Sequence, residues 1–177
     1  MKRMKATFSI MAIAFGLTMP MQIAFADGED NLPPLPVLTA QWWQWAFSIP
    51  TSVNPQLDDT GQDCMVGQRG SIWFLAGVFG SGSAKRTCSV PEGAMLFFPV
   101  INSAFVNTPE CGQGGQSFSV KEERIAVKPF IDAVQNLSVT VDGVDVKKTL
   151  LRRVQSAPFA TAVPADNIFG ADLTVRR

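Results

Sequence analysis

The chain has 177 residues with 15 basic and 15 acidic side chains, and it contains neither His nor Tyr. The absence of His excludes Ser-His and Cys-His nucleophilic catalysis and the usual imidazole metal ligands. Beyond the first five residues the basic side chains form no block. Neither nucleic acid nor an anionic membrane surface is therefore an expected partner.

The first 26 residues have the pattern of a secretory signal peptide. A basic start precedes an apolar run over residues 6–25, and Ala24-Phe25-Ala26 supplies a small-x-small cleavage site. A transmembrane anchor is the alternative, but Pro20 and Gln22 interrupt the run and no basic stop-transfer signal follows. We predict a signal peptide over residues 1–26. The mature protein would be exported, periplasmic or extracellular, with no transmembrane segment.

Residues 27–37 form an acidic and Pro-rich leader, and residues 38–177 are predicted to form a single domain. The domain opens with a predicted helix over residues 38–49, which Thr39 can cap and Pro50 can stop. Its apolar side chains fall on a wide face that would cover a sheet.

The same helix has a functional interpretation. Trp43 lies at the margin of the apolar face, where its ring could stack on a sugar. Gln41 and Gln44 fall on the polar stripe, where their amides could bind hydroxyl groups. Trp43, Gln41 and Gln44 are accordingly the candidate ligand-binding residues.

Residues 71–79 and 94–101, taken as strands, would carry apolar side chains on both faces. This pattern is typical of central strands that are covered on both sides. We therefore predict a mainly β fold, a β-sandwich-like single domain with two packed α-helices, and α+β as the alternative.

The second half of the chain carries clear local signals. Ser119-Val-Lys-Glu122 is a capping box that opens an amphipathic helix to about Asn136, with Pro129 expected to kink or divide it. Asp142-Gly143 separates two apolar-alternating runs and predicts a hairpin. Two further short strands are expected over residues 150–154 and 159–163.

Three cysteines, Cys64, Cys88 and Cys111, are an odd number for an exported chain. Cys64 precedes the first predicted central strand and Cys88 lies on the polar run that returns beside it. We predict a Cys64–Cys88 disulfide and a free thiol at Cys111.

The chain holds four distinctive motifs: Gln41-Trp-Trp-Gln-Trp-Ala46, Cys64-Met-Val-Gly-Gln68, Trp73-Phe-Leu-Ala-Gly77, and Cys88-Ser-Val-Pro-Glu-Gly93 leading to Leu96-Phe-Phe-Pro-Val-Ile-Asn102. By these motifs the chain resembles a family of uncharacterised exported bacterial proteins. The resemblance implies export and one compact domain rich in β-structure, and it supplies no activity. Members of the family look longer, with another Cys and further strands beyond the position of Phe169. We therefore expect this domain to be truncated at its C-terminus.

The function expected from the sequence is an exported, non-catalytic binding or envelope-associated module whose ligand is a glycan or an envelope component. The alternative is a carboxylate-based glycan hydrolase, which needs only two acids. Its candidates would be Asp58, Asp59, Asp63 and Glu92, although no spacing singles out a pair. The Asp cluster does not match an EF-hand loop, so neither a metal nor a cofactor is predicted.

Overall fold

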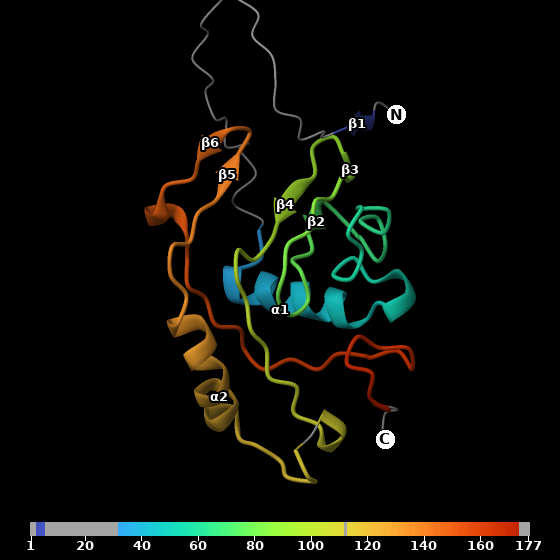
Figure 1. The fold of residues 1–177 in the computed structure, drawn as a ribbon, viewed down its shortest axis with the longest axis vertical. Helices are drawn as coiled ribbons and strands as arrows, with labels where there is room; N and C mark the ends of the chain where they lie inside the picture. The colour runs from blue at the N-terminus through green and yellow to red at the C-terminus, as the bar shows by residue number, and fades with distance from the viewer. Residues whose placement is uncertain (1–2, 6–31, 112, 174–177) are drawn as a thin grey trace, which may run out of the picture.

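The computed structural model describes residues 3–5, 32–111 and 113–173 (Figure 1). Apart from residues 3–5, the predicted signal peptide lies outside the described residues. The described elements, in chain order, are β1 (Arg3–Lys5), α1 (Leu35–Phe47), η2 (Thr51–Val53), β2 (Ile72–Phe74), β3 (Ser89–Pro91), β4 (Met95–Phe97), η3 (Pro109–Cys111), α2 (Val120–Asp132), β5 (Thr140–Val141), β6 (Val144–Asp145) and η4 (Lys148–Leu150).

The prediction of a mainly β, sandwich-like domain is wrong. The described strands are two or three residues long and form three separate two-stranded ladders: β1–β3 antiparallel, β2–β4 parallel and β5–β6 antiparallel. A sandwich needs two sheets that face each other across a common core. The fold is an irregular α+β arrangement in which helices and loops make up most of the described chain.

The core is built on α1 rather than on a sheet. This helix begins at Leu35, after the N-cap Pro34 and three residues earlier than the sequence predicted, and Thr39 donates to the carbonyl of Leu35 inside the helix instead of capping it. Tryptophans and Phe47 project from several sides of α1 and are buried. The central cluster consists of Trp42, Trp43, Trp45, Ala46, Phe47, Ile49 and Ile168.

Loops wrap around α1 and are tied to it by side chains. Trp42 Nε1 donates to the carbonyl of Leu75 at 2.9 Å, and Trp45 Nε1 donates to that of Val66 at 3.0 Å. The buried Asn54 amide donates to the carbonyls of Ala46 and Ile49 at 2.9 and 3.1 Å, and so closes the end of the helix. Backbone groups that a sheet would pair are satisfied here by side chains.

The two predicted central strands are therefore short. Gln68 accepts from the amide of Phe74 at 3.0 Å and donates to its carbonyl at 2.7 Å, which occupies the end of β2 as a neighbouring strand would. Farther along, the Arg86 guanidinium donates to the carbonyls of Ala76 at 2.9 Å and Gln56 at 3.3 Å. These bonds hold residues 75–88 against loops instead of in a ladder.

Residues 98–157 form a second region, which we call the arm. It contains the β5–β6 hairpin, at the upper left of Figure 1, and α2, at the lower left. The capping box is present, because Ser119 accepts from the amide of Glu122 while the Glu122 carboxylate accepts from that of Ser119. Pro129 lies inside the helix without dividing it, and none of the helix's residues is buried. Of the two helices that were expected to pack on the domain, only α1 buries side chains in the core.

The hairpin is shorter than predicted, but its turn is correct. Asp142 and Gly143 adopt positive φ angles of 50° and 78°, as a tight turn of this type requires. The two strands expected over residues 150–154 and 159–163 are absent among the described residues: Leu150 ends η4, and residues 151–163 have no regular secondary structure.

Candidate functional site

A large hollow separates α1 from the arm. Its volume is about 1810 Å³, and residues of α1, the 97–108 segment, α2, the hairpin and the 148–163 segment line it. The floor on the α1 side includes Trp42, Trp43 and Phe47, which are otherwise buried in the core. Typical small-ligand pockets measure about 300–1,000 Å³, so this hollow is larger than one small polar ligand needs.

Aliphatic and aromatic side chains in this hollow are open to solvent. Eight of its lining residues are both apolar and exposed by more than a third: Leu35, Phe98, Val100, Ile101, Val120, Ile125, Val141 and Leu150. Scattered exposed apolar residues are ordinary, but a contiguous set that faces a concave surface is typical of a binding surface.

The arm side of the hollow carries basic side chains beside its apolar ones. Six exposed cationic residues line it: Lys121, Arg124, Lys128, Lys148, Arg152 and Arg153. Glu123 is the one acidic residue among the described lining, and its carboxylate accepts from the Asn107 amide at 2.7 Å. We call these six residues the basic rim.

Asp132 neutralises part of the basic rim. The ion pairs within the described residues join Asp132 to Lys128 and to Arg153, the latter at 2.7 Å. The hydrogen bonds from Lys128 and then Arg153 lower the pKa of Asp132, so it stays ionised through the neutral range. Arg124 donates to the carbonyl of Ser156 at 3.3 Å. These contacts hold α2 beside the 151–157 segment, so basic residues of α2 and of that segment lie next to each other.

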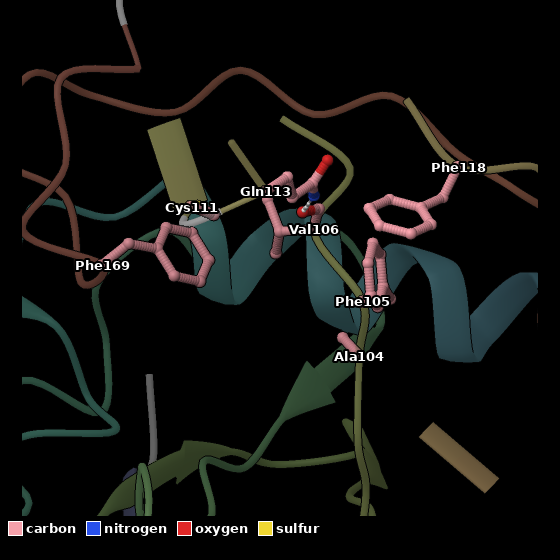
Figure 2. Close-up of a pocket in the computed structure, with 7 residues that line it drawn as sticks. All are labelled: Ala104, Phe105, Val106, Cys111, Gln113, Phe118 and Phe169. Carbon is pink, nitrogen blue, oxygen red and sulfur yellow. Dashed lines mark hydrogen bonds between the residues drawn. The ribbon is translucent and has the colours of Figure 1, made fainter. Parts of the chain in front are cut away.

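A second, smaller pocket surrounds Cys111 (Figure 2). Its volume is about 410 Å³, and Phe105 and Phe118 meet edge to face at one side while Phe169 and Cys111 lie at the other. Burial raises the pKa of the Cys111 thiol, and the neighbouring negative charge of Glu110 raises it further. A raised pKa lowers the thiolate fraction at neutral pH, which is unfavourable for a nucleophile.

The residues predicted to bind a ligand do not come together. Trp43 is the most exposed of the four tryptophans but is only 8% exposed, and its ring packs against Trp42 and Phe47. Gln44 donates to the carbonyl of Ala160 at 2.8 Å and so helps dock the C-terminal segment on α1. Gln41 is exposed, and of the three residues Trp43 alone lines the hollow. Sugar binding by this trio stays a prediction that no contact supports.

The candidate carboxylates lie away from both cavities. Burial raises the pKa of Asp58, but hydrogen bonds from the Asp63 amide, from Thr60 and from the Gly61 amide outweigh it, and the net pKa is lowered. Asp58 thereby organises its own loop, with the Asp63 amide at 2.9 Å. Asp59 and Glu92 are exposed. Among the described residues, no group of three or more acidic, Cys or His side chains could hold a metal ion.

The disulfide prediction is confirmed. Cys64 and Cys88 are bonded with their Cα atoms 5.7 Å apart, and Cys111 is free. The bond fastens the loop before β2 to the chain entering β3. It is typical of proteins that fold in an oxidising compartment.

The basic rim is the part of the site that the sequence analysis missed. Its members are spread over residues 121–153, and Arg152-Arg153 is the one adjacent pair among them. Two signals were available in the sequence. Lys121, Arg124 and Lys128 recur at helical spacing and share one side of α2, and residues 147–153 hold four basic residues in seven. That these two groups lie together becomes visible only when the chain returns beside that helix.

Comparisons of the chain with protein family models, curated proteins and solved structures found no match. Within the part of the chain that the structure describes, no helix has the length and apolar character needed to cross a bilayer.

Proposed function

We propose that this protein is an exported, non-catalytic binding module that takes up an apolar component of the cell envelope in the hollow between α1 and the arm. The observation that carries the proposal is the hollow itself, about 1810 Å³ in volume and lined by apolar side chains that solvent can reach. Covering those side chains with an apolar ligand is favourable by roughly 25 cal/mol for each Å² removed from water.

Two further observations support the exported part of the proposal. The Cys64–Cys88 disulfide is the kind of bond that persists outside the reducing cytoplasm. The pattern of the first 26 residues is that of a secretory signal. Intact-mass measurement of the exported protein should find Asp27 as its first residue, and retention of Met1 would contradict export by cleavage.

A glycan hydrolase has no comparable support. Hydrolysis by two carboxylates requires a pair of acids across the scissile bond, about 5–10 Å apart. Glu123 is the one acid among the described residues that line the hollow, and it is engaged by Asn107. The lining of the hollow therefore favours binding over hydrolysis.

Binding can be measured with Nile red, a neutral dye whose fluorescence rises in apolar surroundings. Ile125 lines the hollow and is 59% exposed, whereas Phe130 on the same helix is 70% exposed and lies outside the lining. Ile125→Asp should weaken dye binding by about tenfold, because it places a charge against the apolar part of the dye. Phe130→Asp is the matched control and should bind as the wild type does.

Circular dichroism would verify that both variants keep the wild-type fold. Equal dye binding by Ile125→Asp and Phe130→Asp would place the dye elsewhere and overturn the proposal. No dye binding by the wild-type protein would overturn it as well.

A further inference from the structure

The hollow combines an apolar wall with a cationic edge. The wall is formed by apolar residues of α1, the 97–108 segment, α2, the hairpin and the 150–163 segment, and the basic rim lies on α2 and residues 148–153. A ligand that satisfies both surfaces must carry an apolar body and an anionic group on the same molecule. Neither a plain hydrocarbon nor a free anion would use both.

The charge balance at this surface differs from that of the chain as a whole. The chain carries equal numbers of basic and acidic side chains. The described residues lining the hollow include six basic side chains and one acidic one. Asp132 pairs with Lys128 and Arg153. The other four members of the basic rim have no acidic partner among the described residues: Lys121, Arg124, Lys148 and Arg152. An excess of one sign around a concave apolar surface favours a ligand of the opposite sign.

We infer that the ligand is a phospholipid with an anionic headgroup, whose acyl chain lies against the apolar wall while its phosphate lies on the basic rim. This inference rests on the proposed binding function and names its ligand class. Burial of the acyl chain's methylene groups supplies most of the affinity. The guanidinium and ammonium groups recognise the phosphate through charge-assisted hydrogen bonds.

The geometry also explains why the cationic residues are exposed instead of buried. Arginine and lysine at the mouth of an apolar surface keep their charged ends in water while their stems cover apolar atoms. A headgroup at that mouth remains partly hydrated, so the charge selects the ligand without a large desolvation cost.

The test is displacement of Nile red from the mature protein by two lysophospholipids of the same acyl chain, below the concentrations at which they form micelles. Lysophosphatidylglycerol is anionic and lysophosphatidylcholine is zwitterionic. The anionic lipid should displace the dye at about tenfold lower concentration. Glycerol phosphate, which has the anionic group without the chain, should not displace it.

Two triple variants of equal composition locate the selectivity. The rim variant is Lys121→Gln, Lys148→Gln and Arg152→Gln. The control variant is Lys147→Gln, Lys85→Gln and Arg69→Gln, which removes the same number of positive charges from exposed positions outside the hollow. The rim variant should lose the preference for the anionic lipid and still bind Nile red, whereas the control should keep both.

Each other outcome overturns the inference in a recognisable way. Equal displacement by the two lipids would leave an apolar binding module without charge selection. Loss of the preference in both variants would assign it to net charge alone. Displacement by glycerol phosphate would indicate a phosphate site with no role for the chain. Absence of dye binding would overturn the proposed function together with the inference.

Discussion

The two helices of this protein have the same length and opposite relations to the core. Each spans 13 residues. α1 lacks a side-chain cap hydrogen bond at its start, yet Trp42 and its neighbours along the helix are buried. α2 has a complete capping box, and none of its residues is buried. Local hydrogen bonds are therefore enough to define a helix end, whereas the side chains that a helix buries decide whether it organises a fold.

The same contrast holds for the contacts that surround each helix. Around α1, the indole of Trp42 and the amide of Asn54 reach buried backbone carbonyls. Around α2, the ties are exposed ion pairs at Asp132 and a bond from Arg124 to Ser156. Exposed pairs of this kind contribute little stability, typically 0–1 kcal/mol. The arm is accordingly the part of the molecule that a ligand can rearrange at the lowest free-energy cost.

The largest expected effect of a substitution lies at Trp42. Its side chain is 1% exposed, and Trp42→Ala should lower the free energy of unfolding by about 3–5 kcal/mol, because it opens a cavity in the core. Phe130→Ala on α2 should change it by less than about 0.5 kcal/mol, since Phe130 is 70% exposed. Urea unfolding followed by tryptophan fluorescence and by circular dichroism measures both. Comparable losses in the two variants would show that α2 packs as tightly as α1.

A smaller effect is expected at Asn54. Asn54→Ala should cost about 1–3 kcal/mol in the same assay, because it leaves the carbonyls of Ala46 and Ile49 without their donor in a buried place. Asn107 in the arm makes similar bonds, to Phe118 and Glu123, but it is exposed. Asn107→Ala should therefore cost no more than about 0.5 kcal/mol. A loss at Asn107 equal to that at Asn54 would remove the distinction between the two regions.

What the sequence could predict follows from how far apart the interacting residues lie. The capping box at Ser119, the Asp142-Gly143 turn and the Cys64–Cys88 bond each depend on residues in one segment or on a short closed loop. Those predictions are correct to within a few residues. The sandwich prediction required the runs at residues 71–79 and 94–101 to pair with additional strands, but β2 and β4 pair only with each other among the described residues.

Apolar runs alone do not determine strand pairing. Residues of both predicted central strands contact the α1 core, since Phe74 and Phe97 pack against it, but the rest of each run leaves the ladder. Gln68 and Arg86 take up backbone groups that a sheet would have paired. An apolar run that covers a helix and one that forms a central strand have the same composition, so periodicity does not separate them.

The candidate site was the least predictable part. Trp43 does line the hollow, but Gln44 is used in docking the segment that contains Ala160. The basic rim combines residues of α2 with residues of the 148–153 segment, and the ion pair of Asp132 with Arg153 joins the two segments. The amphipathic pattern of residues 38–49 drew attention to α1, whereas the cationic residues that line the hollow lie in the arm.

The smallest expected effect concerns the start of α2 and its dependence on pH. The Ser119 side chain and then the Ser119 amide donate hydrogen bonds to Glu122, and they lower the pKa of this carboxyl below its usual value of 4.5. A carboxyl with a lowered pKa in the folded state stabilises that state above its usual pKa, and the contribution is lost as the pH falls through the lowered value. The first turn of α2 should therefore loosen on acidification below about pH 4.5, before the α1 core responds.

Amide chemical shifts of Ser119 and Glu122, followed by NMR from pH 7 to pH 3, measure this. Glu122→Gln keeps an acceptor that does not titrate and should remove the transition, while Ser119→Ala should loosen the turn at every pH. If the Trp42 indole shifts in step with the α2 amides, the two helices belong to one cooperative unit, and the division into core and arm does not hold.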